Sequence, residues 1–243
     1  MRITGPRMLM FLTVCIGGGS LVLFVYFLLF GAPLSVSIER SEPARLAWDA
    51  LLCLVFFLQH SGMIRRGVKG RITRRIPATY YPVLYSVASG VALIALVLLW
   101  QPSDRFLFRL GDAGRWVSVC VVLVAVVGFV WGVRSLRWFD PFGRLALQAS
   151  LRGVNPPPAA FVAEGAYLVV RHPLYLFMLV LIWSTPRFST DQLLFNVLWT
   201  LWIVVGTKLE ERDLVADFGE SYRRYQLSVP MLIPYPRPLR HRA

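Results

Sequence analysis

Six stretches of apolar residues, separated by segments rich in arginine, dominate this chain of 243 residues. The hydrocarbon core of a bilayer is about 30 Å thick, so a helix that spans it needs about 20 apolar residues. The fifth stretch is short, and Pro173 and Pro186 bracket it, which predicts a tight helical hairpin with the sixth. The predicted spans cover residues 8–30, 46–63, 80–100, 115–133, 174–185 and 192–208. We therefore predict an all-α integral membrane protein with about six transmembrane helices.

The composition agrees with this fold class. Apolar residues make up 56% of the chain and charged residues 16%, whereas a soluble domain of this size needs more polar residues to cover its surface. The three cysteines, Cys15, Cys53 and Cys120, all fall inside apolar spans. Buried single cysteines act as small apolar side chains, so the sequence indicates neither a disulfide framework nor a metal site.

The basic residues are distributed unevenly along the chain. A net charge of +13 would indicate nucleic-acid binding in a soluble protein. Here 20 of the 26 Lys and Arg residues lie in the N-terminus, the loops 64–79 and 134–173, and the C-terminal tail. Cytoplasmic loops of membrane proteins carry such an excess. We therefore expect both termini in the cytoplasm, contact with anionic lipids, and no nucleic-acid partner.

Arg171, His172 and Pro173 open the fifth predicted span. Proline is well tolerated at the first helical position, and the residue before it is held extended, so His172 is fixed at the mouth of a helix. A helix N-terminus beside an arginine favours an anionic group. A simpler interpretation is also open, in which the Arg-His pair only anchors the helix among lipid headgroups.

Two adjacent acids, Glu210 and Glu211, follow the sixth predicted span. Charges at a membrane boundary are costly unless they are solvated or paired. Helical spacing places Glu211 on one stripe with the aromatic residues that follow it, and Glu210 on another, so we expect Glu211 to face protein and Glu210 to face water. This stretch predicts a cytoplasmic amphipathic helix that Gly219 can interrupt. A solvated charge pair remains the alternative to a ligand site.

His60, near the end of the second predicted span, is the third candidate. Its unperturbed pKa of about 6.5 suits proton transfer at neutral pH, and its neighbours Gln59 and Ser61 could orient its ring. A core histidine bonded to a carbonyl is an equally good interpretation of its position.

Two separated motifs flank the predicted hairpin. The first is Gly165-Ala166-Tyr167, then three residues, then Arg171-His172-Pro173-Leu174-Tyr175. The second is Glu210-Glu211-Arg212-Asp213-Leu214 followed by Phe218-Gly219-Glu220, Tyr222 and Tyr225. Together they resemble the isoprenylcysteine carboxyl methyltransferase and phospholipid methyltransferase superfamily. The segments 59–63, 138–143 and 229–234 resemble its methanethiol S-methyltransferase and NnrU-like branch.

The resemblance implies a methyl donor, S-adenosylmethionine, and a two-part chain. Residues 1–135 would form a four-helix transmembrane region, and residues 136–243 a donor-binding methyltransferase region in a bacterial inner membrane. The implied donor-binding residues are Tyr167, Arg171, His172, Tyr175, Glu210 and Glu211. His60 is the candidate base, and no metal is expected. Phe177 stands where the family often has glycine, which leaves the shape of the substrate passage open.

Three functions remain open from the sequence. The first is methyl transfer to a small apolar thiol such as methanethiol, with dimethyl sulfide as the product. The second keeps the donor but has an isoprenylcysteine carboxylate or a lipid amine as acceptor. The third is a non-enzymatic, NnrU-like membrane protein.

Overall fold

The computed structural model describes residues 4–33, 41–136 and 161–235, and these residues are mostly helical. Five of the described helices are long and apolar enough to cross a membrane, which confirms the predicted fold class. They cover Met8–Phe30, Glu42–Ile64, Ala78–Leu99, Asp112–Arg134 and Thr190–Phe218. The fifth predicted span forms a helix of 11 residues, Pro173–Trp183, which rises about 16 Å. A sixth span therefore stays a prediction.

The first span consists of α1 (Thr4–Thr13), a π-helical turn η1 (Val14–Gly18) and α2 (Gly19–Phe30). The next helices are α3 (Glu42–Ile64), α4 (Arg66–Thr73), the 3-10 turn η2 (Ala78–Tyr80), α5 (Tyr81–Leu99) and α6 (Asp112–Arg134). The C-terminal half contains the 3-10 turn η3 (Gly165–Leu168), α8 (Pro173–Trp183), α9 (Thr190–Phe218) and α10 (Glu220–Ser228). Two short strands, β1 (Phe106–Arg109) and β2 (Arg187–Ser189), pair with each other. Neither strand was predicted from the sequence.

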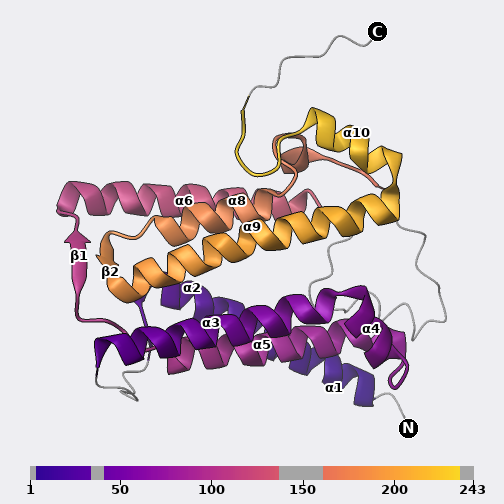
Figure 1. The fold of residues 1–243 in the computed structure, drawn as a ribbon, viewed down its shortest axis with the longest axis horizontal. Helices are drawn as coiled ribbons and strands as arrows, with labels where there is room; N and C mark the ends of the chain where they lie inside the picture. The colour runs from indigo at the N-terminus through magenta and orange to yellow at the C-terminus, as the bar shows by residue number, and fades with distance from the viewer. Residues whose placement is uncertain (1–3, 34–40, 137–160, 236–243) are drawn as a thin grey trace. The chain divides into compact units, whose positions relative to one another are not determined.

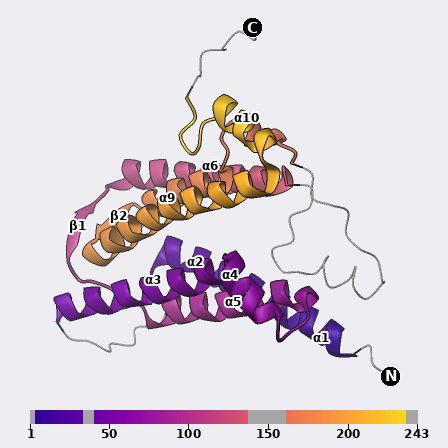
Figure 2. The same ribbon diagram turned by 45° about the vertical axis from the view of Figure 1, so that its right-hand side comes forward.

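The chain forms two compact units, and the first contains α1 to α5 and residues 188–199. In this unit α3 and α5 lie side by side (Figure 2). A β-carbon at Gly90 of α5 would lie 3.0 Å from the backbone oxygen of Ile16, so glycine at this position favours the close approach of the first span. Phe24, Phe195 and Trp199 form an aromatic core, with ring centroids 4.9 to 6.1 Å apart.

The second unit contains α6, η3, α8, residues 200–218 of α9, and α10. In this unit α6 and α8 lie side by side (Figure 1). A β-carbon at Gly128 of α6 would lie only 2.1 Å from Cε1 of Phe177, so the phenylalanine ring packs directly on the α6 backbone. Phe177 is therefore accommodated by a glycine on the neighbouring helix.

Hydrogen bonds near both ends of α8 join it to α9. Trp183 Nε1 donates to Thr200 Oγ1 over 3.0 Å, and Tyr175 donates its hydroxyl to Glu210 Oε2 over 2.7 Å. Because residue numbers rise along one helix as they fall along the other, α8 and the adjoining part of α9 run antiparallel. This arrangement agrees with the predicted helical hairpin.

Gly219 separates α9 from α10, at a φ of +56° that favours glycine. Beyond this break, Tyr222, Tyr225 and Val229 are buried in a small apolar cluster. Phe161, Ala163, Leu214, Val215 and Phe218 pack against it. The predicted stripe of aromatic residues therefore stays on the protein interior, although two helices carry it instead of one.

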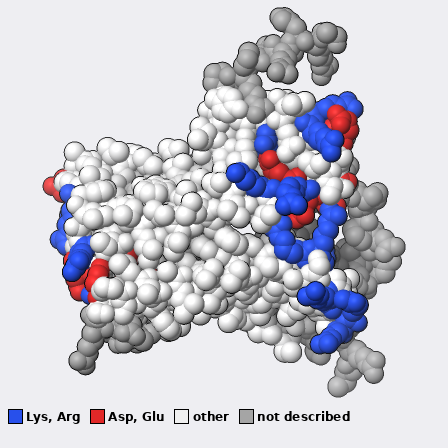
Figure 3. Space-filling model, viewed as in Figure 1, with Lys and Arg blue, Asp and Glu red and all other residues white. Residues whose placement is uncertain are grey.

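Charged side chains of the second unit gather at the two ends of its helices, near the start of α6 and where α9 ends and α10 begins, whereas the surface along the helices is uncharged (Figure 3). This distribution suits helices embedded in hydrocarbon with polar ends in the headgroup region. The boundary predicted between residues 135 and 136 stays a prediction. Residues 138–143, one segment of the family resemblance, lie outside the described residues.

Candidate functional site

Arg171 and His172 lie between η3 and α8, where they pair with the chain's C-terminal segment. The backbone N–H of Arg171 donates to the oxygen of Pro230 over 2.8 Å, and that of His172 donates to Met231 over 3.1 Å. Pro173 then begins α8 at the position where a missing N–H costs nothing. This backbone pairing brings the first sequence motif against the segment that follows the second.

The Arg171 side chain is directed into the protein. Its Nε lies 2.5 Å from Glu211 Oε1, and another guanidinium nitrogen donates to the oxygens of Gln226 and Val229. These two carbonyls are at the C-terminal end of α10, where a cation interacts favourably with the helix dipole. Arg171 is only 8% exposed. Its buried side chain thus joins Glu211 to the C-terminal end of α10.

Glu211 receives donors from three parts of the unit. Besides Arg171, His172 Nε2 lies 3.3 Å from Oε1, and Gln226 donates to Oε2 over 3.0 Å. The Glu211 side chain is 12% exposed, whereas that of Glu210 is 43% exposed. The helical stripe predicted this difference. A carboxylate held by an ion pair and two further contacts has a fixed position, which suits binding of a cationic or hydroxyl group.

Glu210, Tyr175 and His172 form the other side of the same cluster. Tyr175 donates its hydroxyl to Glu210 Oε2, and the rings of His172 and Tyr175 stack at 5.5 Å between centroids and an interplanar angle of 7°. His172 Nδ1 lies 3.8 Å from Glu210 Oε2. The His172 ring is therefore placed between the two acids, with one nitrogen toward each.

Tyr167 joins the cluster through the backbone. Its carbonyl oxygen accepts a hydrogen bond from the Tyr225 hydroxyl, which ties η3 to α10. Burial raises the pKa of both phenols well above the ordinary value of about 10, so both stay neutral. The second unit thus holds all six predicted donor-binding residues, five of them in direct side-chain contact.

An open hollow of about 440 Å³ lies beside Glu211. Its lining residues are Lys208, Glu211, Arg212, Val215 and Gln226. Lys208, Arg212 and Gln226 were not among the predicted site residues. The two cations lie three residues before and one residue after Glu211, a spacing that could have indicated them. Gln226 lies beyond the break at Gly219, so helical spacing alone could not place it.

His60 lies in the first unit, on α3. Its Nδ1 lies 3.2 Å from the Ser89 hydroxyl, and the Tyr85 hydroxyl lies 3.0 Å from its Nε2. The ring of Phe56 stacks on it with centroids 5.2 Å apart. The side chains that orient the ring thus include two from α5, whereas the sequence predicted only its neighbours on α3, Gln59 and Ser61, in this role. Its role as a base stays a prediction.

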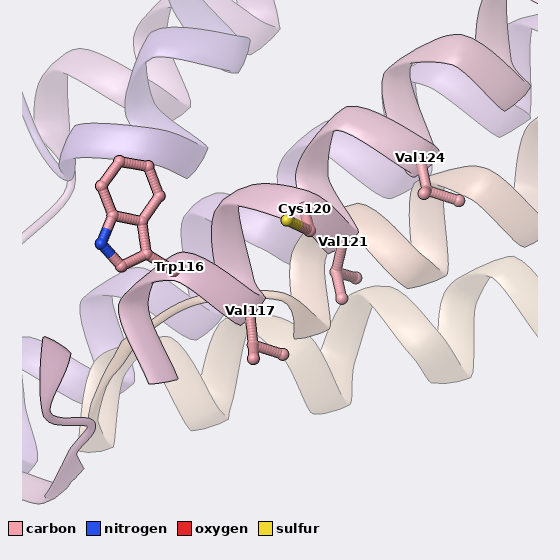
Figure 4. A pocket seen from close by; sticks show the side chains of 5 residues that line it. All are labelled: Trp116, Val117, Cys120, Val121 and Val124. Atoms are coloured by element: carbon pink, nitrogen blue, oxygen red, sulfur yellow. The ribbon is translucent and has the colours of Figure 1, made fainter. Parts of the chain in front are cut away.

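A second hollow, of about 360 Å³, lies on α6. Trp116, Val117, Cys120, Val121 and Val124 line it (Figure 4). This lining suits contact with an alkyl chain and offers, apart from the Cys120 thiol, no group that could take part in catalysis. Within the described ranges, no group of three or more His, Cys, Asp or Glu residues could hold a metal ion.

Comparison with known proteins identifies the family. The model of the NnrU protein family matches residues 49–186, which is more than half of the chain. The chain belongs to the NnrU family. This confirms the resemblance that the two motifs and the three shorter segments indicated. No solved structure matches this NnrU-family chain.

Several curated relatives carry the name of an enzyme. The methanethiol S-methyltransferase of Pseudomonas deceptionensis is 36% identical over 202 residues, which are 80% of this chain and 74% of the relative. The methanethiol S-methyltransferase of Pseudomonas sp. strain GM41 is 34% identical over 88% of each chain. Nurim of Rattus norvegicus is 28% identical over 78% of this chain and 75% of its own length.

Proposed function

We propose that this protein is a membrane methyltransferase that transfers the methyl group of S-adenosylmethionine to a small thiol such as methanethiol, giving dimethyl sulfide. The observation that carries the proposal is the cluster of Arg171, His172 and Glu211 beside an open hollow. The relatives named methanethiol S-methyltransferase cover most of the chain and support the same chemistry.

The residues present fit this donor. S-adenosylmethionine carries a sulfonium, an amino-acid head with an ammonium and a carboxylate, and a ribose diol. Glu211 is fixed, lines the hollow, and accepts one described side-chain bond at Oε2, so a lone pair remains for the ammonium or a ribose hydroxyl. Aromatic rings attract cations, and Tyr175 stacks on His172 in the same cluster, which suits a sulfonium nearby.

Arg171 has a different role in this proposal from the one its sequence position suggests. Its guanidinium pairs with Glu211 and with the end of α10, and the residue is almost fully buried. We therefore assign it the task of holding Glu211 ionised and correctly oriented. The site would lose its shape without Arg171 even if the arginine never touched the donor.

Methyl transfer needs little covalent assistance from the protein. The thiolate sulfur would attack the methyl carbon in line while the bond from that carbon to the sulfonium breaks, and S-adenosylhomocysteine would leave as a neutral thioether. Positioning alone can supply about 7–11 kcal/mol of the acceleration. Exclusion of water from the reacting sulfur strengthens local electrostatics. The nucleophile is the thiolate, so the acceptor loses its proton first, and His60 is the proposed base.

The proposed location is a bacterial inner membrane, with both termini in the cytoplasm. The excess of Lys and Arg in the N-terminus, two loops and the C-terminal tail supports this orientation. It places the hollow beside Glu211 on the side where a nucleoside methyl donor is available. A volatile thiol partitions into lipid, so a site at the membrane boundary is accessible to both reactants.

Transfer of a labelled methyl group tests this function. Purified protein would receive labelled S-adenosylmethionine with methanethiol, with an isoprenylcysteine, or with a lipid amine, and each product would be counted. We expect label in dimethyl sulfide, and much less of it from Glu211→Gln when the donor is supplied below saturation. Label in the product of the isoprenylcysteine or of the lipid amine would show that this compound, and not a thiol, is the methyl acceptor. No transfer to any acceptor would favour a non-enzymatic membrane protein, to which the similarity with nurim would then be relevant.

A further inference from the structure

Lys208 and Arg212 line the hollow beside Glu211, and both are exposed. Both residues belong to α9, as do Glu211 and Val215. Positions 208, 211, 212 and 215 are three, four and seven residues apart counted from the first, so all four side chains lie on one face of the helix. Within the ranges that the structure describes, neither cation forms an ion pair with an acid. Two cations of this site thus remain available to a ligand.

The charges around the hollow do not cancel within the protein. Arg171 neutralises Glu211 through their 2.5 Å contact, so Lys208 and Arg212 leave an excess of positive charge on the lining. A cation pair of this kind attracts a carboxylate or a phosphate. The adjacent Glu211 oxygen, in contrast, accepts a donor such as an ammonium. The lining therefore suits a ligand with both an anionic and a cationic group.

We infer that Lys208 and Arg212 bind the carboxylate of the donor's amino-acid head, while Glu211 receives its ammonium. The inference rests on the proposed function and adds a subsite to it. It also gives the two arginines different roles. Arg171 positions Glu211 from inside the protein, and Arg212, which lines the hollow, contacts the ligand. The Val215 side chain supplies an apolar wall for the methylene groups of the head.

Calorimetry with two nucleosides tests the subsite without any turnover. The ligands are S-adenosylhomocysteine and its decarboxylated analogue, which lacks only the carboxylate. We expect the wild type to bind the first more tightly, and Lys208→Gln and Arg212→Gln each to weaken that binding about tenfold. Affinity for the decarboxylated analogue should stay unchanged in both variants, because the contact that they remove is absent from that complex.

Arg223→Gln is the matched control, since Arg223 is an exposed cation of α10 that does not line the hollow. It should leave both affinities at the wild-type value. Two results would overturn the carboxylate subsite and leave the donor site in place. One is that Lys208→Gln and Arg212→Gln lose as much affinity for the decarboxylated analogue as for S-adenosylhomocysteine. The other is that Arg223→Gln loses as much affinity as these two variants do. If the wild type bound neither nucleoside, the donor site itself would be wrong.

Discussion

Each of the two units holds a histidine close to the end of an apolar helix. The neighbours of one histidine are uncharged, and the neighbours of the other are carboxylates. The contacts of His60 in the first unit, with Tyr85, Ser89 and Phe56, are all uncharged. His172 in the second unit lies between Glu210 and Glu211. The same side chain is thus fixed by neutral hydroxyls in one unit and by carboxylates in the other.

This difference indicates two separate tasks. A cluster of opposite charges in a partly dry environment holds a polar ligand in a fixed orientation, which is what a charged methyl donor needs. In our proposal the imidazole of His60, which lies among hydroxyl groups, accepts the proton of the thiol. We therefore propose donor binding for the second unit and acceptor activation for the first. The following substitutions test that division.

The largest expected effect comes from the first unit. His60→Ala should lower turnover about 100-fold, because a general base contributes at least that much, and should leave donor affinity nearly unchanged. Initial rates and calorimetry on the same preparation measure the two quantities. A parallel loss of turnover and affinity would make His60 a structural residue and remove the division of tasks.

In the second unit, Glu211→Gln should weaken donor binding about 30-fold, because it removes the charge at the centre of the cluster. Glu210→Gln is the matched control, since its side chain is 43% exposed against 12% for Glu211. We expect it to weaken binding severalfold less, because solvent screens the exposed carboxylate. Calorimetric titration with S-adenosylhomocysteine decides, and equal losses would contradict the unequal roles of the two acids.

A third effect concerns the support of the charged cluster. Gly128→Ala places a β-carbon 2.1 Å from the Phe177 ring, so this ring, or α8 that carries it and begins right after His172, must shift. We expect a loss of about 1–3 kcal/mol in stability, seen as a lower melting temperature in detergent.

Phe177→Ala in the same chain should restore part of that stability, because it removes the clashing ring. Gly206→Ala of α9 is the control, since a β-carbon there has no neighbour within 4 Å. Unchanged melting of Gly128→Ala would show that α6 and α8 are not packed as tightly as described.

The smallest effect is expected at the outer edge of the cluster. Tyr225→Phe removes the hydrogen bond to the Tyr167 carbonyl and should cost about 1 kcal/mol in stability. Tyr222→Phe is the control, because the Tyr222 hydroxyl has no hydrogen-bond partner among the described residues. Denaturant titration compares the two, and a greater loss in Tyr222→Phe would contradict the proposed tie between η3 and α10.

The sequence predicted those features that depend on local pattern. Apolar length gave the spans, and helical spacing separated buried Glu211 from exposed Glu210. Two features could not be predicted in this way. The π-helical turn at Val14–Gly18 adds a single residue to one helical turn, which the length of an apolar stretch does not reveal. The strands β1 and β2 have only four and three residues, which is too short for a periodic pattern.

The partners of Arg171 and His60 could not be predicted from local pattern either. Arg171 pairs with residues 40 to 58 positions away, and His60 contacts hydroxyl groups of α5 some 25 to 29 positions away. Such contacts depend on how helices pack. The glycine that receives Phe177 lies on α6, so a departure from the family pattern is explained only once that packing is known.

Dimethyl sulfide in the headspace above cells tests the central claim most directly. Cells expressing the protein and supplied with methanethiol should release dimethyl sulfide well above cells that carry an empty vector. Expression of Glu211→Gln at the same level should return the signal close to that background. Equal release from the wild type and the empty vector would contradict the account.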